Sequence, residues 1–193
     1  AEVSFSKDFK EPLEKILKLL PYFNKDAKNI AYDQGNRDIA AGKAAMMMQG
    51  PWAYAGILTA NPDFKGGMFP LPMTEDPKDT RVTANLDLTA FMPASGSGAT
   101  REGAQAFLDY VMQPEVMHNY NTETLAFSPD KDAPRQKSPL VSDLNDYMFA
   151  GKYVQGPGLY IPTAIPVPTY IQEWIYGGSV ETFTGKLDRD WNR

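Results

Sequence analysis

The sequence predicts a mixed α/β or α+β fold, and three observations support this prediction. Amphipathic helical segments are interspersed with short apolar segments of the strand type. The chain has 193 residues, of which 42% are hydrophobic, so it can bury a real core. No internal repeat or low-complexity tract breaks the pattern.

Helical periodicity and helix-start residues predict most of the elements. The first helix spans residues 6–20, where Leu13, Ile16 and Leu17 share one face, and it ends at Pro21. Proline at a first helical position, or a capping residue, marks most of the others. These are residues 33–41, a helix that begins at Pro51, one capped by Thr100, one from Pro114 to about residue 122, one from Ser138 and one from Pro168.

Three short apolar runs are predicted to be strands: residues 44–49, 68–71 and 86–92. The first contains three consecutive methionines, which can fill the core space that branched aliphatic residues usually occupy. Residues 151–168 form a connection rich in glycine and proline. It is too long for an ordinary turn, so it is a candidate binding loop.

Composition excludes several classes of protein. The formal net charge is −5 and no lysine or arginine cluster is present, so nucleic acid is not an expected partner. The absence of cysteine excludes disulfides, thiolate metal sites and a cysteine nucleophile. No run approaches the ~20 apolar residues that a membrane-spanning helix needs.

Signals for catalysis and for metal binding are weak. The single histidine, His118, lies in a helical pattern with no Gly-x-Ser-x-Gly motif in the chain, so we expect a surface or packing role for it. With no second histidine and no calcium loop, neither a metal nor a cofactor is expected. Carboxylates for glycosidase chemistry are available in Asp87, Glu173 and Asp188. Only Asp87 interrupts an apolar strand, where it must face solvent, a partner or a ligand.

Aromatic residues give the more informative signal. They gather after the Gly50-Pro51 step and around the late loop, and they are Trp52, Tyr54, Tyr153, Tyr160, Tyr170 and Trp174. Flat rings can stack on the C–H faces of sugars, whereas amide and carboxylate side chains can pair with the hydroxyls. Core packing is the competing interpretation for each ring, and Trp52 is the ring for which we favour a binding role.

Two blocks of sequence resemble one known family. The run DIAAGKAAMMMQGPWAYAGI, followed by NPDFKGGMFPLP, and the later VTANLDLTAFMPASGSGATREGAQAFLDYVMQPEVMHNYN are similar to the carbohydrate-binding, maltose-binding-protein-like branch of the solute-binding proteins of ABC importers. The resemblance implies a type II periplasmic-binding-protein-like α/β fold with two lobes. It implies a sugar held between the lobes, delivery to the membrane permease, and no catalysed reaction. It also implies an extracellular, periplasmic or cell-surface location, and it is compatible with a lipid anchor.

The resemblance further implies that the chain holds mainly the C-terminal lobe, with the N-terminal portion missing. On this basis we expect residues 1–84 and 131–193 to form two parts of the C-terminal lobe. Residues 85–130 would hold the hinge strand and the segment that crosses to the other lobe, with the return near residues 127–132.

The resemblance also indicates ligand-binding residues. Trp52 matches the family's stacking aromatic, and Tyr54 lies at a second aromatic position. Asn85 and Asp87 lie where the crossing strand passes the cleft, and either Tyr170 or Trp174 matches a late stacking aromatic. Two alternatives stay open: the same fold binding another solute, such as a peptide, polyamine or metal chelate, and a glycoside hydrolase that uses Asp87.

Overall fold

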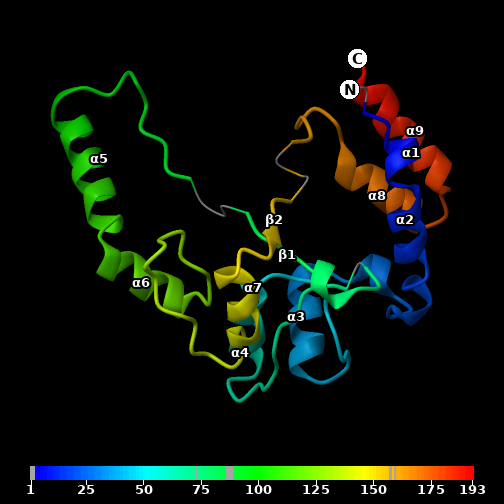
Figure 1. Cartoon of the computed structure of the whole chain (residues 1–193), viewed down its shortest axis with the longest axis horizontal. Helices are drawn as coiled ribbons and strands as arrows, with labels where there is room; N and C mark the ends of the chain where they lie inside the picture. The colour runs from blue at the N-terminus through cyan, green and yellow to red at the C-terminus, as the bar shows by residue number, and fades with distance from the viewer. Residues whose placement is uncertain (1–2, 73, 86–88, 157, 159) are drawn as a thin grey trace. The chain divides into compact units, whose positions relative to one another are not determined.

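The structure is a computed structural model that describes residues 3–72, 74–85, 89–156, 158 and 160–193. The chain divides into two compact units (Figure 1). Unit 1 combines residues 1–31 with residues 156–193, and unit 2 spans residues 32–155. The two ends of the chain therefore fold together, although they are far apart in the sequence.

The units are built mainly from helices. In unit 1 these are α1 (Phe5–Asp8), α2 (Lys10–Leu17), α8 (Val167–Ile175) and α9 (Val180–Trp191), with 3-10 turns at Leu20–Tyr22 and Ala27–Asn29. Unit 2 contains α3 (Tyr32–Ala40), α4 (Ala53–Ala60), α5 (Gly98–Val111), α6 (Pro114–Glu123) and α7 (Asn145–Phe149), with 3-10 turns at Pro77–Asp79 and Ser142–Leu144. Its strands are β1 (Val82–Thr83) and β2 (Tyr153–Val154).

Within the described ranges, none of these helices has the length and apolar character needed to cross a membrane.

The core of unit 1 forms where α2 and α8 pack on α9. Leu13 of α2 is buried there, as its position on the apolar face predicts. The indole of Trp174 stacks on Phe183, with the ring centroids 5.2 Å apart and the planes 20° apart. The full set of buried residues in this core is Phe5, Leu13, Ile165, Trp174, Val180, Phe183 and Leu187.

A carboxylate in α9 joins the N-terminal helix α1 to the C-terminal part of unit 1. Asp188 accepts hydrogen bonds from the backbone N–H groups of Phe5 and Ser6, at 2.6 and 3.1 Å, and from Ser6 Oγ at 2.5 Å. It therefore satisfies N–H groups at the start of α1 that have no partner inside that helix. Burial raises the pKa of Asp188, but the hydrogen bonds from Ser6 and Phe5 outweigh burial and hold the pKa below its usual value.

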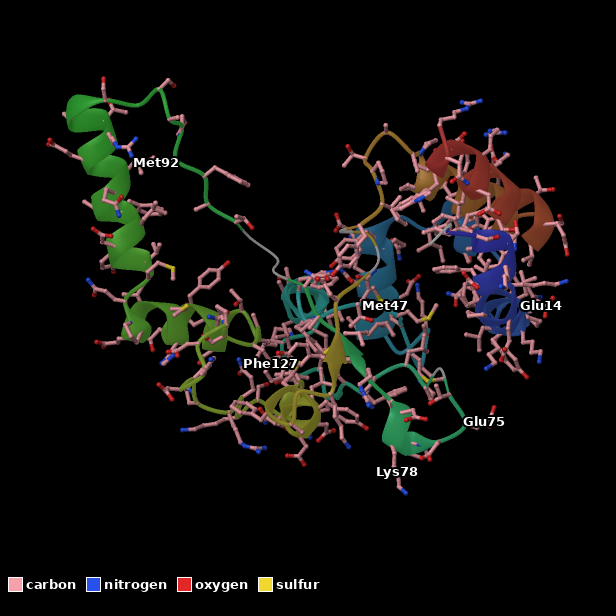
Figure 2. The ribbon with its side chains drawn as sticks, turned by 45° about the horizontal axis from the view of Figure 1, so that its top comes forward. Glu14, Met47, Glu75, Lys78, Met92 and Phe127 are labelled. Carbon is pink, nitrogen blue, oxygen red and sulfur yellow. The ribbon has the colours of Figure 1, made fainter. Side chains whose placement is uncertain are left out.

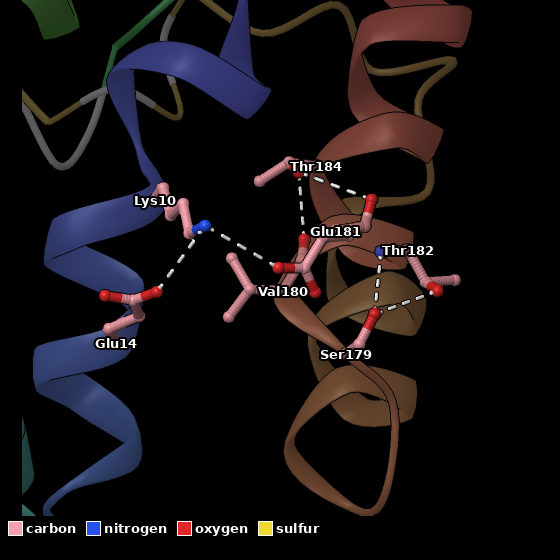
Figure 3. Close-up of polar contacts among 7 residues, drawn as sticks. All are labelled: Lys10, Glu14, Ser179, Val180, Glu181, Thr182 and Thr184. Atoms are coloured by element: carbon pink, nitrogen blue, oxygen red, sulfur yellow. Dashed lines mark hydrogen bonds and ion pairs between the residues drawn. The ribbon is translucent and has the colours of Figure 1, made fainter.

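The turn between α8 and α9 determines how these helices meet. Ser179 Oγ accepts a hydrogen bond from Thr182 N at 3.1 Å and so caps α9 (Figure 3). Lys10 of α2 reaches Glu181 in the first turn of α9 at 3.8 Å, which adds an exposed ion pair of small energetic value. Before the cap, Gly178 lies against backbone, because a Cβ there would be 2.9 Å from Glu173 O and 3.0 Å from Trp174 Cα.

Two glycine substitutions in unit 1 should have opposite effects on stability. Gly178→Ala should lower the free energy of unfolding by about 1–3 kcal/mol, because backbone atoms cannot move away from the new methyl group. Gly185→Ala, inside α9 with nothing within 4 Å, should raise it by about 0.5–1 kcal/mol, because alanine restricts the unfolded chain and favours a helix. Urea unfolding followed by tryptophan fluorescence measures both, and a Gly178→Ala variant as stable as wild type would contradict the close contact.

Unit 2 is organised around the pair α3 and α4. Its core comprises Ile39, Ala40, Ala53, Tyr54, Ile57, Leu140 and Val141, of which Val141 is fully buried. Met47, labelled in Figure 2, packs against this core, whereas its neighbours Met46 and Met48 are exposed. Of these three methionines, the segment between α3 and α4 thus presents only the middle one to the interior.

Two buried amides join the later part of unit 2. Gln136 N donates to Asn145 Oδ1 at 3.0 Å, and Asn145 Nδ2 donates back to Gln136 O at 2.9 Å. The side chain of Gln136 also donates to the carbonyl oxygens of Asn121 and Ala126. This network holds the end of α6 to the start of α7. It also gives hydrogen-bond partners to buried polar groups, which would otherwise destabilise the folded state.

The structure confirms most of the predicted helices. Residues 6–20 are helical but broken at Phe9 into α1 and α2, and α3, α4, α6 and α8 lie where they were predicted. The Thr100 cap is wrong, because α5 begins at Gly98 with Ser97 as its N-cap residue.

The individual strand predictions were less successful. Residues 44–49 and 68–71 are not strands, and 89–92 are not either; residues 86–88 lie outside the described part. An apolar run fixes which side chains face inward, but a strand also needs a neighbour for its backbone hydrogen bonds. No backbone hydrogen bond joins residues 44–49 to another described segment. The described strands are β1 and β2 instead, paired in parallel with Val82 opposite Tyr153 and Thr83 opposite Val154.

Candidate ligand-binding residues

Trp52 lies at the start of α4 and is 58% exposed. Pro51 fixes the backbone before it, and a tight turn follows in which Ala53 N donates to Gly50 O at 3.1 Å and Tyr54 N donates to Pro51 O at 3.0 Å. The indole Nε1 donates to Gln49 Oε1 at 3.0 Å. An exposed ring in a fixed position is the geometry that the binding interpretation of Trp52 requires.

One face of this indole is covered by backbone. A Cβ placed on Gly50 would lie 2.1 Å from Trp52 Cζ3, 2.2 Å from Cη2 and 2.5 Å from Cε3. Similar short distances to three consecutive ring atoms mean that residue 50 lies over the ring face and not at its edge. The exposed surface of the indole therefore belongs mainly to the opposite face and the rim.

Tyr54 has a structural position. It is 6% exposed, and its ring is part of the unit 2 core, 6.3 Å from the Phe64 ring between centroids. Its hydroxyl lies 3.1 Å from Leu140 O and 3.2 Å from Gly67 O, either of which can accept its single proton. Burial raises the pKa of the Tyr54 phenol. The predicted ligand contact of Tyr54 is not available in this arrangement, because the ring has no open face.

Asn85 follows β1 and lies past the carboxyl end of a parallel strand pair. In that pair Ala84 N donates to Val154 O at 2.9 Å, so residue 85 comes directly after the last rung. The carboxyl ends of parallel strands are a common location for ligand sites in α/β proteins. Asp87, the other residue predicted on this crossing, lies outside the described residues.

Tyr170 and Trp174 both belong to α8 in unit 1. Trp174 is 4% exposed and lies in the core, and its Nε1 has no hydrogen-bond partner among the described atoms. The Tyr170 hydroxyl donates to Asp190 Oδ2 at 2.5 Å, and Lys186 Nζ lies 5.1 Å from the Tyr170 ring centroid. Both residues line a cavity of about 20 Å³, which has room for roughly one water molecule and not for a sugar.

The structure thus divides the predicted residues between the units. Trp52, Tyr54 and Asn85 are in unit 2, whereas Tyr170 and Trp174 are in unit 1. Sequence reasoning missed Gln49 and Gly50, which contact the Trp52 indole directly. Their positions, two residues and one residue before Pro51, were visible in the sequence, but only the packing of the Trp52 side chain shows that both touch the ring.

The other chemical groups of interest have structural roles. His118 of α6 lies 2.9 Å from Asp130 Oδ2 through Nε2, so it ties α6 to the segment where the return of the chain was predicted. The pKa of Asp130 is lowered, first by the backbone N–H of Asp132 and then by His118. Within the residues that the structure describes, no group of three or more histidine, aspartate or glutamate side chains is placed to hold a metal ion.

Comparison with protein families identifies the chain. The sequence model of the family described as bacterial extracellular solute-binding protein matches residues 1–145 of the 193. The chain belongs to this family, whose fold is of the periplasmic-binding-protein type and whose members act outside the cytoplasm. Members work with the permease of an ABC importer and bind the solute that it transports, and they are generally not enzymes. No curated protein matches the chain.

The contacts of Asp190 with Arg189 and Tyr170 should make unit 1 sensitive to acid. Hydrogen bonds from Arg189 and Tyr170 lower the pKa of Asp190 from 3.8 to about 2. Because the folded pKa lies below the unfolded one, the stabilisation is complete above about pH 4 and is lost as the pH falls through about 2. The melting temperature of wild type should fall more steeply across this window than that of Asp190→Asn. Parallel curves for the two proteins would show that this carboxylate is not held as described.

Proposed function

We propose that this protein captures a sugar or oligosaccharide and delivers it to the permease of an ABC importer. The observation that carries the proposal is Trp52, whose indole is anchored on one face and exposed on the other. A pyranose has an apolar C–H face that matches a single open aromatic face. No reaction is needed for this role, because binding and release are sufficient.

The surroundings of Trp52 are consistent with a hydroxyl-rich ligand. Gln49 lies beside the ring, and Asn85 is in the same unit at the end of the parallel strands. Amide side chains donate and accept at once, which suits the hydroxyl groups of a sugar. We include Asp87 as a further contact because the family resemblance implies that it lies where the chain crosses between the lobes. Trp174 would contribute only after a rearrangement of α8, because it is buried, whereas Tyr170 is half-buried with its hydroxyl held by Asp190.

We further propose the two-lobe α/β form of the fold, in which residues 85–130 hold the hinge and cross to the second lobe. Helix α5 supports this, since its apolar residues lack a core of their own. Phe107 is 63% exposed, and Tyr110 and Met112 are exposed as well. A one-sided apolar helix normally packs against another element. Ligand binding would then shift the equilibrium between the open and closed arrangements of the lobes towards the closed one, which the permease recognises.

Trp52→Ala should weaken sugar binding by about 1–3 kcal/mol, the range for loss of a buried aromatic anchor. Isothermal titration calorimetry of the full-length protein with candidate mono- and oligosaccharides gives this number. Tyr22→Ala is the control, because Tyr22 is an exposed aromatic of unit 1 that the proposal leaves outside the site. If wild type bound a peptide, polyamine or metal chelate and no sugar, the carbohydrate assignment would be wrong.

Phe107→Glu should lower the melting temperature of the full-length protein by more than an ordinary surface change. A charge on a face that packs against the second lobe costs roughly 2 kcal/mol or more, whereas exposed substitutions usually stay within about 0.5 kcal/mol. Gln105→Glu introduces the same charge on the side of α5 opposite Phe107 and serves as the control, with only the small cost of losing the exposed hydrogen bond from Gln105 to Asp109. Equal melting temperatures for the two variants would argue against a packed α5.

A further inference from the structure

The two residues before Pro51 hold the Trp52 ring, and this is more than a consequence of their position in the chain. Gly50 lies under the six-membered ring, and Gln49 accepts the hydrogen of the indole N–H. We propose that Gln49 and Gly50 are positioning residues for ligand recognition, which together hold the indole as a one-sided platform. This inference rests on the proposed function, in which the open face of Trp52 contacts the ligand.

Gly50 is required by contact and not by backbone conformation. Its φ is not in the left-handed region, so an alanine is acceptable to the backbone. The added Cβ would nevertheless lie 2.1 Å from Cζ3, well inside the distance that two carbon atoms tolerate. Gly50→Ala must therefore displace the indole from its position over residue 50, while the backbone conformation stays allowed.

Gln49 is chosen by its chemistry as an acceptor. The indole Nε1 is a donor only, so the atom that meets it at 3.0 Å must be an acceptor, which assigns the amide oxygen to this contact. Glutamate in place of Gln49 keeps an acceptor of similar reach. Leucine has similar volume but no acceptor, so Gln49→Leu removes the hydrogen bond and Gln49→Glu preserves it.

The two contacts are complementary because they restrict different motions. Packing on Gly50 fixes the plane of the ring, and the bond to Gln49 fixes its rotation within that plane. A ring that is already ordered loses less conformational freedom when a ligand binds. Losing this preorganisation should weaken binding by roughly 2- to 12-fold, the equivalent of ordering one side chain.

The seat is tested first without ligand. In full-length protein labelled with ¹⁵N-tryptophan, the Trp52 indole signal is assigned by its loss in Trp52→Phe. We expect Gly50→Ala and Gln49→Leu to shift this signal and to accelerate exchange of its N–H with solvent, whereas Gln49→Glu keeps it protected. Far-UV circular dichroism verifies that each variant folds. If Gly50→Ala does not fold, the result for Gln49→Leu decides the test. An unchanged indole signal in both variants would overturn the proposed seat.

The ligand arm uses the sugar that binds wild type most tightly in calorimetry. Gly50→Ala and Gln49→Leu should lose roughly 2- to 12-fold in affinity, and Gln49→Glu should stay close to wild type. A displaced ring with unchanged affinity would overturn the positioning role. If no sugar binds to wild type, the proposed function fails, whereas the measurements without ligand still decide whether Gln49 and Gly50 hold the ring.

Discussion

The buried ring of Tyr54 is the constraint on which the candidate site depends. It packs in the core between α3, α4 and the segment around Leu140, and its hydroxyl lies within hydrogen-bond distance of two backbone carbonyls. Successive residues of a helix are rotated by about 100° around its axis, so residues two positions apart point about 200° away from each other. With Tyr54 directed into the core, Trp52 at the helix start is directed outward. The exposure of one aromatic is thus a consequence of the burial of the other.

Local contacts then convert an outward ring into an ordered one. An exposed tryptophan would normally sample several rotamers, but here backbone covers one face and a side-chain acceptor holds the N–H. All the residues involved lie within one short stretch, from Gln49 to Tyr54. In the proposed function this compactness is an advantage, because a recognition element built on one turn keeps its shape when the rest of the protein moves.

Unit 1 shows how similar residues can serve stability instead. Trp174 and Tyr170 also follow a proline-rich loop, but Trp174 stacks on Phe183 and Tyr170 is held by Asp190 and Lys186. The same α9 helix receives the N-terminal helix through Asp188. These contacts link the first and last parts of the chain. The aromatic residues of α8 therefore serve the core of unit 1.

The sequence by itself predicted most of the helices and the family, and it singled out Trp52 as the aromatic residue for which a binding role is proposed. Helical periodicity and proline placement are local properties, and the family blocks are continuous runs of residues, so neither needs knowledge of distant contacts. Only the tertiary structure decided that Tyr54 and Trp174 are buried, that residues 44–49 have no strand partner among the described segments, and that Gly50 lies under an indole. The burial of the two rings and the missing strand partner depend on which segments meet in space, and the spacing of residues along a chain does not specify such long-range contacts. The Gly50 contact is local, but it depends on the rotamer that Trp52 adopts, which the sequence does not specify.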